Sequence, residues 1–144
     1  MLAVVQRVSR AAVRVDDELV AAIGRGLLVL VGVADGDDER DCEQLARRIR
    51  NLRLFPSERR PLDLALDDVA GEILCVSQFT LLADTRKGRR PSFERAAPPD
   101  RARPLYERVV ELLGARSGRF GAHMAVELVN DGPVTVIVDS RRGR

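Results

Sequence analysis

The chain has 144 residues, of which 45% are hydrophobic, and a formal net charge of +2. This length predicts one domain, residues 1–144, with a substantial hydrophobic core. No apolar run approaches the roughly 20 residues that cross a bilayer, and the first residues lack the pattern of a signal peptide, so the expected location is the cytoplasm. The charge is too small to indicate a nucleic-acid partner on its own.

The first part of the chain is predicted to form strands. Residues 2–8 and 11–15 are short β-rich runs, and an acidic turn at 16–18 leads to a strand at 19–23, which predicts a hairpin. Residues 27–33 are continuously apolar, as expected for a central strand that is covered on both faces.

An amphipathic helix is predicted next. Polar residues at 35–38 supply a turn and an N-cap, and residues 39–52 carry one apolar stripe at helical spacing. The stripe consists of Cys42, Leu45, Ala46, Ile49 and Leu52. Residues 55–68 are expected to be a loop with a short helical piece, followed by an interior strand at 71–79.

A long basic loop and a second helix follow. Residues 85–99 are polar and basic and include three prolines, and this length favours a functional loop over a simple connection. Asp100 is expected to cap a helix that stops at Gly114.

Two strands are predicted to close the fold. They occupy residues 121–129 and 134–139 and flank a turn at 130–133, and the basic tail at 140–144 is expected to be mobile. Strands outnumber helices and are joined by hairpins at both ends of the chain. The pattern therefore predicts an α+β fold with a mostly antiparallel sheet and helices packed on one face.

The first candidate for chemistry is the polar segment Ser77, Gln78, Phe79 and Thr80. A strand that ends in such residues places hydroxyls, an amide and free backbone N–H groups at a sheet edge, where N–H groups can hold an oxyanion. The Thr80 hydroxyl is suited to orient a substrate or a water molecule. The alternative is an ordinary strand end whose Ser and Thr side chains bond local backbone groups. The pattern alone leaves both open.

The second candidate is the segment Asn130-Asp131-Gly132-Pro133. A hairpin turn is the simpler interpretation, because Gly supplies an unusual φ and Pro fixes the next one. A Gly–Pro bond can also be cis at a cost of about 0.5–1 kcal/mol, which turns two neighbouring carbonyl groups the same way. Such a pair of acceptors suits an ammonium group.

The basic residues Arg86, Lys87, Arg89 and Arg90 follow the first polar segment closely. One interpretation is contact with phosphates, which positions a nucleic acid without reading its sequence. The other is a solvated basic loop.

The remaining reactive side chains are few. His123 is the single histidine and has no orienting acid nearby in the sequence, so a structural role is favoured over that of a general base. Cys42 and Cys75 cannot make a disulfide framework or a zinc site alone and are expected to be buried, inert thiols. No pattern predicts a metal site.

Taken together, these segments resemble the D-aminoacyl-tRNA deacylase family. The resemblance runs nearly end to end, through residues 5–8, 26–29, 51–53, 71–74, 77–81, 83–93, 120–124 and 130–135. Several long strings in the right order are more specific than one short motif. The chain departs from the family pattern at residues 60–63 and at Asp17, where a turn glycine is usual.

The resemblance implies a barrel-like sheet and a homodimer with sites at the subunit interface. It implies a hydrolase without a cofactor that cleaves the ester joining a D-amino acid to the 3′-terminal adenosine of tRNA, and that also accepts glycine. Gly132 and Pro133 are then expected to form a cis peptide that enters the partner's site, binds the α-ammonium group and excludes L side chains. Arg7 is expected to brace this turn.

The resemblance also assigns the other segments. Ser77 to Thr80 are expected to hold the ester, with the N–H groups of Phe79 and Thr80 at the carbonyl oxygen. The 2′-OH of the tRNA ribose is expected to help activate water, and residues 86–90 to meet acceptor-stem phosphates. Two other functions stay open: a non-catalytic tRNA-binding dimer, and a small-molecule hydrolase or isomerase with His123 as its base.

Overall fold

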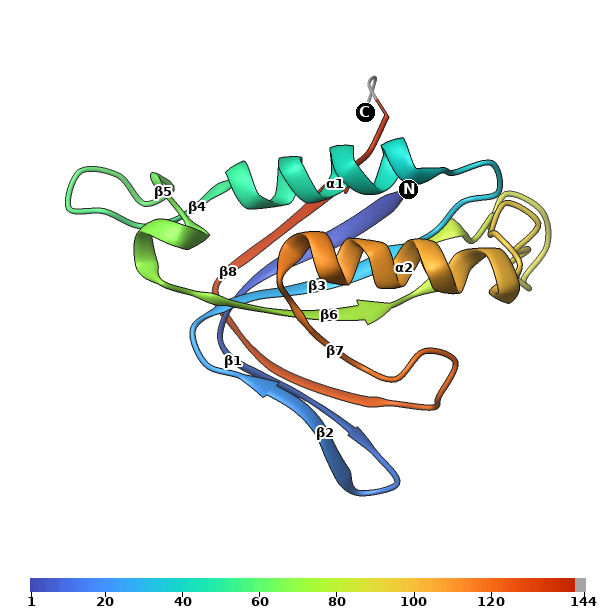
Figure 1. The fold of residues 1–144 in the computed structure, drawn as a ribbon, viewed down its shortest axis with the longest axis horizontal. Helices are drawn as coiled ribbons and strands as arrows, with labels where there is room; N and C mark the ends of the chain where they lie inside the picture. Colours follow the sequence, from blue (N-terminus) through green and yellow to red (C-terminus); the bar gives the residue numbers. More distant parts are fainter. Residues whose placement is uncertain (142–144) are drawn as a thin grey trace.

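The computed structural model describes residues 1–141 and is organised around one long strand, β1 (Leu2–Val15) (Figure 1). The first half of β1 pairs antiparallel with β3 (Gly26–Gly32) and the second half with β2 (Glu18–Ile23). Its other edge pairs antiparallel with β8 (Ala125–Asp139) along nearly the whole length. The predicted hairpin between β1 and β2 is confirmed, and both of its turn residues, Asp16 and Asp17, have positive φ.

The sheet continues on the far side of β3 with parallel pairing. β6 (Glu72–Ser77) pairs parallel with β3, and the short β7 (Arg116–Ser117) pairs parallel with β6. The predicted α+β class is confirmed, with a sheet that is mixed and curls towards closure. The parallel pair arises because a helix crosses over between β3 and β6.

That crossover helix, α1 (Glu39–Asn51), forms as the sequence predicts. Asp38 caps it by accepting hydrogen bonds from the backbone N–H groups of Arg40 and Asp41, and the Asp41 side chain accepts from the Asp38 N–H. The stripe from Cys42 to Ile49 is buried against α2, β1 and β8, and Leu52, just past the end of the helix, is partly buried. Between α1 and β6 the chain forms three short elements, β4 (Arg53–Phe55), β5 (Leu64–Ala65) and the 3₁₀ helix η1 (Leu66–Val69).

The second helix, α2 (Pro99–Leu113), lies beside α1 on the same face of the sheet (Figure 1). The predicted cap at Asp100 is wrong, because the N-cap is Pro98 and the helix already begins at Pro99. Proline is favoured at the first helical position, where its missing N–H leaves no acceptor unpaired. The predicted stop at Gly114, which has a φ of +60°, is confirmed.

The buried side chains form two clusters. The larger one fills the space between the sheet and the two helices, and the smaller one fills the curl of the sheet where β1, β2, β3 and β6 approach one another. Arg7 and Val8 are adjacent in β1 and both buried. Consecutive residues of a regular strand point to opposite faces. The buried residues of β1 before Arg7 therefore belong to the larger cluster and those from Val8 to Val13 to the smaller one. The change falls where the pairing of β1 with β8 is irregular.

The closing part of the chain differs from the prediction. Strands at 121–129 and 134–139 around a turn were expected, but the chain does not reverse: β8 is a single strand, and Asn130–Pro133 lie inside it. The register against β1 shifts twice at this point, and the Asn130 side chain bonds the N–H of Val134. Residues that interrupt a strand can form either a bulge or a turn. Here they form a bulge, because β8 pairs with β1 on both sides of them.

The predicted mobility of residues 140–144 is also wrong for the part of the tail that is described. Ser140 is buried and donates a hydrogen bond to Asp41, and Arg141 forms ion pairs with Asp37 and Asp41. Residues 142–144 lie outside the described part. No helix within residues 1–141 has the length and hydrophobicity to cross a membrane.

Candidate functional site

A pocket of about 560 Å³ lies where β6 ends. Its base is formed by the last residues of β6, one wall by the segment that leads into α2, and the other wall by residues 120–124. The lining is mostly apolar and includes Phe79, Phe93, Ala97, Phe120 and Met124. A largely apolar group fits such a cavity, with its polar partners at the end of β6.

The segment Ser77–Thr80 supplies those polar groups. The last hydrogen bond that joins it to the sheet runs from the Gln78 N–H to the Val31 carbonyl, at 2.7 Å. The chain then turns into a 3₁₀ helix, η2 (Phe79–Leu82), which leaves the first N–H groups of the helix without intrahelical acceptors. Within the described residues, neither the Phe79 nor the Thr80 N–H donates to a protein acceptor.

The side chains of this segment are also arranged. Gln78 donates from Nε2 to the Thr80 hydroxyl at 2.5 Å. Phe79 is 54% exposed and meets Phe93 edge to face, with ring centroids 5.1 Å apart. Ser77, Gln78 and Phe79 line the pocket, and Thr80 is exposed beside it. The structure thus brings the first predicted segment together at one cavity.

The second predicted segment lies elsewhere in the chain. Gly132 and Pro133 are exposed on β8, are joined by a cis peptide bond, and do not line this pocket. Gly132 has a φ of +145°, and a Cβ there would lie 2.8 Å from the Val134 N and 3.2 Å from Arg7 Nη2. Both the backbone conformation and the lack of space require glycine.

Arg7 holds this segment in place. Its side chain is almost fully buried, Nε donates to the Asp131 carbonyl at 2.8 Å, and Nη1 donates to the Leu54 carbonyl at 2.7 Å. The Asp131 carboxylate lies 3.8 Å away but is more than half exposed. The guanidinium therefore ties the backbone before Gly132 to β4.

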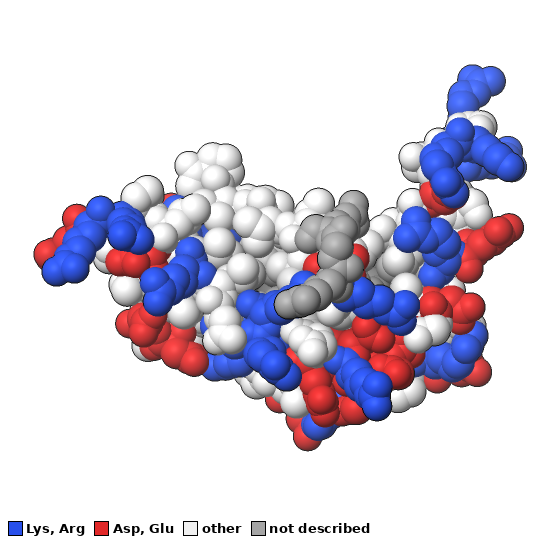
Figure 2. Space-filling view, turned by 90° about the horizontal axis from the view of Figure 1, so that it is seen from above, with Lys and Arg blue, Asp and Glu red and all other residues white. Residues whose placement is uncertain are grey.

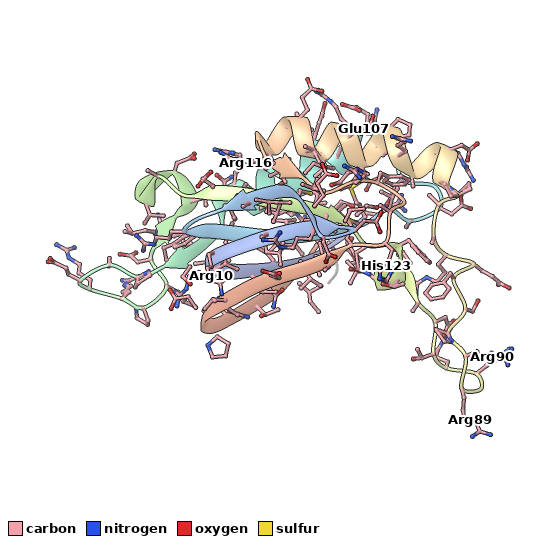
Figure 3. The ribbon with its side chains drawn as sticks, turned by 90° about the horizontal axis from the view of Figure 1, so that it is seen from below. Arg10, Arg89, Arg90, Glu107, Arg116 and His123 are labelled. Carbon is pink, nitrogen blue, oxygen red and sulfur yellow. The ribbon has the colours of Figure 1, made fainter. Side chains whose placement is uncertain are left out.

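The basic loop, residues 85–91, projects from the body of the molecule. Arg89 and Arg90 stand at its far end and point away from the sheet (Figure 3), and basic side chains gather on this projection at one corner of the surface (Figure 2). Lys87, Arg89 and Arg90 are exposed and form no ion pair within the described residues. Arg86 differs, because it is paired with Asp84, and its hydrogen bonds hold the pKa of that carboxyl well below the usual range.

Several residues of the pocket carry no signal at the level of sequence pattern. Phe93, Phe120 and Met124 come from segments far from Ser77 along the chain, and spacing does not reveal that they meet. His123 also lines the pocket and is exposed. Cys75 is fully buried, and burial raises the pKa of its thiol to about 12, which agrees with the predicted inert thiol.

Known proteins match the chain over nearly its full length. The family model described as D-Tyr-tRNA(Tyr) deacylase matches residues 4–139. A D-aminoacyl-tRNA deacylase of Thermotoga petrophila is 54% identical over 99% of this chain and 99% of its own, and one of Dehalococcoides mccartyi is 56% identical over 98% and 95%.

Two solved structures are similar as well. A structure described as "c-Myc DNA Unwinding Element Binding Protein" has a TM-score of 0.93 and 42% identity, over 98% of this chain and 99% of that one. A second, described as a probable eukaryotic D-amino acid tRNA deacylase, has a TM-score of 0.78 over 96% and 98% of the chains. At 18% identity, this second likeness shows the fold alone.

Proposed function

The chain belongs to the D-Tyr-tRNA(Tyr) deacylase family, and on that basis we propose that it hydrolyses D-aminoacyl-tRNA to free D-amino acid and tRNA. The observation that carries this proposal is the pair of unused N–H groups, those of Phe79 and Thr80, beside an apolar pocket. An aminoacyl ester is already labile. Its hydrolysis needs positioning and charge stabilisation more than a strong base.

The N–H groups of Phe79 and Thr80 are the proposed oxyanion site. Negative charge develops on the carbonyl oxygen when water attacks the ester, and each donor placed in advance is worth about 3 kcal/mol of barrier. Ser77 and Gln78 position the ester and the terminal ribose, and Gln78 fixes the Thr80 hydroxyl. Replacing Thr80 by Ala is expected to lower turnover only a few-fold, because the N–H group remains.

Water activation is assigned to the substrate. The pocket offers few titratable side chains, and His123 has no hydrogen-bond partner in residues 1–141 that would orient it as a base. The 2′-OH of the terminal ribose lies next to the ester in any aminoacyl-tRNA and supplies the missing polar group. A fully active His123→Ala protein is expected; a loss of more than about 100-fold would favour the small-molecule hydrolase or isomerase with His123 as base.

Chiral selection is assigned to Gly132 and Pro133 of a second subunit in a homodimer. In this proposal their carbonyl groups bind the substrate α-ammonium group and leave no room for an L side chain, so D-amino acids and glycine pass. Two observations support a shared site: the segment does not line its own pocket, and it is rigidly held yet exposed. The exposed face of β8 also carries Val129 and Ile137, which are 41% and 63% exposed, as expected for a covered interface.

The basic loop is proposed to bind the acceptor stem of tRNA, with Lys87, Arg89 and Arg90 in contact with phosphates. Arg86 belongs to the same loop. Because aminoacyl-tRNA is the substrate, the proposed location is the cytoplasm.

The experiment that tests the function compares D-tyrosyl-tRNA and L-tyrosyl-tRNA at enzyme concentrations far below substrate. Rapid loss of the D-ester with the L-ester intact is the expected result. Loss of both esters at equal rates would contradict the chiral selection. Loss of neither, with tRNA still bound in a salt-dependent way, would favour the non-catalytic tRNA-binding dimer, which the unpaired cations of the basic loop also fit.

A mixing experiment tests the shared site. Two inactive variants, one altered at Phe79 and one at Gly132, are unfolded together and refolded. In a mixed dimer one of the two sites then has both native segments, so about a quarter of the wild-type activity is expected to return. No recovery, although mass measurements show mixed dimers, would place both segments in one subunit's site.

A further inference from the structure

Asp84 and Arg86 close the base of the basic loop. Asp84 Oδ1 accepts hydrogen bonds from the Arg86 backbone N–H at 3.0 Å and from Nε at 2.9 Å, and Oδ2 accepts from Nη2 at 2.5 Å. The backbone of Asp84 exchanges two hydrogen bonds with Ser92, at 2.8 and 2.9 Å. The loop therefore leaves and re-enters the body of the protein through one clamped position.

The clamped position is connected to the candidate active site. Phe93 follows Ser92 directly, lines the pocket, and packs edge to face on Phe79. On the side where the chain enters the loop, Asp84 comes two residues after the end of η2. The first two residues of η2, Phe79 and Thr80, carry the free N–H groups. The direction in which the loop leaves the protein is thus fixed relative to the oxyanion site.

Arg86 differs from the other cations of the loop because it is held in an ion pair with Asp84. The Asp84 side chain is 24% exposed and the Arg86 side chain 84%, so the pair is open to solvent and contributes little to the free energy of unfolding. Its planar, multiply bonded geometry restricts rotation instead. Lys87, Arg89 and Arg90 lack such a partner within residues 1–141 and remain available to anions.

We propose that Asp84 is a positioning residue for RNA binding: it fixes Arg86, and through Arg86 the direction of the basic loop, so that Lys87, Arg89 and Arg90 meet phosphates while the 3′ end lies at Phe79 and Thr80. Arg86 is then the partner of Asp84 rather than a phosphate contact. This inference rests on the proposed function. It adds an acidic residue to a surface that binds a polyanion.

The two possible roles of Arg86 predict opposite changes in tRNA affinity for the substitution Asp84→Asn. If Arg86 contacts phosphate, Asp84→Asn removes a competing negative charge, frees the guanidinium and strengthens tRNA binding. If the pair positions the loop, Asp84→Asn weakens binding although it makes the surface more positive. Asparagine keeps an oxygen for the Arg86 backbone N–H, so the change is confined to the ion pair.

The test measures KM and kcat for D-tyrosyl-tRNA and for D-tyrosyl-adenosine, which lacks every phosphate, with wild type, Asp84→Asn, Arg86→Gln and the double variant. We expect each single change to raise KM for the tRNA ester about 3–10-fold, with kcat and the adenosine ester unaffected. The double variant is expected to match the single ones, since either change opens the same pair. The matched control is Asp67→Asn. Asp67 lies in η1, at the opposite end of the molecule (Figure 1), and its exposed carboxylate pairs with Arg50 of α1.

The salt dependence of tRNA binding gives a second readout. Lys87→Gln removes one phosphate contact and is expected to reduce the slope of log affinity against log salt by about 0.9. Arg86→Gln keeps the contacts of Lys87, Arg89 and Arg90 in the bound state and only leaves the free loop less ordered, so affinity is expected to fall with the slope unchanged. A lower KM for Asp84→Asn, or a reduced slope for Arg86→Gln, would overturn the proposal. An equal loss on the adenosine ester would overturn it too, because the pair would then serve the catalytic segment.

The proposed function and this inference can fail separately. If wild type cleaves neither ester, the proposed function fails. The dissociation constants of uncharged tRNA for the same four proteins then decide the inference, with a weaker Asp84→Asn protein supporting it and a stronger or equal one overturning it.

Discussion

The segments Ser77–Thr80 and Asn130–Pro133 look alike in sequence and behave differently in the structure. Each is a short polar stretch after an apolar strand. The first leaves the sheet at η2 and exposes backbone N–H donors, whereas the second stays within β8. Within residues 1–141 the pairing of β6 with β3 ends at Val31, whereas β8 is paired with β1 on both sides of the interruption. A polar stretch thus ends a strand where the neighbouring strand stops pairing with it, and forms a bulge where the neighbouring strand pairs on both sides of it.

The largest effect is expected from removing a backbone N–H group of the segment Ser77–Thr80. Phe79→Pro removes the Phe79 N–H at the first position of a 3₁₀ helix, where proline is tolerated, and Phe79→Ala removes the ring but keeps the N–H. We expect kcat of the proline variant to fall about 100–1,000-fold below that of the alanine variant. Single-turnover hydrolysis of D-tyrosyl-tRNA measures this, and equal rates in the two variants would remove the Phe79 N–H from the mechanism.

The segment Asn130–Pro133 is tested at Gly132. A Cβ at this position meets the Val134 N and Arg7 Nη2, and the φ of +145° disfavours any L side chain, so the segment must move in Gly132→Ala. A shift of about 1 Å in a positioning group costs about 100-fold. We expect the ratio of D-ester to L-ester hydrolysis to fall by about that factor, and an unchanged ratio in a folded variant would contradict the assigned role.

Arg7 distinguishes the two segments further, because only the second has a buried cation behind it. Arg7→Met keeps the length of the side chain but leaves the Asp131 and Leu54 carbonyls without their donor. The free energy of unfolding in urea is expected to fall by on the order of 1–3 kcal/mol, and chiral selectivity with it. Arg10→Met, in the same strand but exposed, is the control and is expected to change stability by less than about 0.5 kcal/mol.

The last expected effect concerns Asp41 and the two residues that follow β8, Ser140 and Arg141. Burial alone would raise the pKa of Asp41, but hydrogen bonds from Ser140 and Arg141 outweigh it and lower the pKa to about 2. The ionised form is therefore favoured in the folded state, and its contribution of about 2 kcal/mol is present above pH 4 and lost as the pH falls towards 2. Urea unfolding between pH 5 and 2 measures this, and in Ser140→Ala the pH dependence over this range is expected to be shallower.

Local chemistry explains which parts of the fold and site could be predicted. The N-cap within residues 35–38, the apolar stripe of α1 as far as Ile49 and the stop at Gly114 depend on neighbours within a few residues, and the structure agrees with all three. The cap of α2 is the exception, because Pro98 and not Asp100 occupies it. The continuity of β8 and the parallel pairing of β3 with β6 depend on contacts between residues far apart in the sequence. Ser77 and Gln78, which stand out in the sequence as a polar strand end, line the pocket. Apart from His123, the wall at 120–124 was not predicted to take part, because it meets Ser77 only in the folded chain.

The pairing of β1 with β8 has a consequence for how the chain is made. Leu2 lies opposite Asp139, so β1 has to wait until β8, far later in the chain, has been synthesised before its second edge is covered. Folding that depends on such distant contacts is slow, and the open edge is exposed to other chains in the meantime. Until β8 has been synthesised, β1 therefore lacks its neighbour along this whole edge.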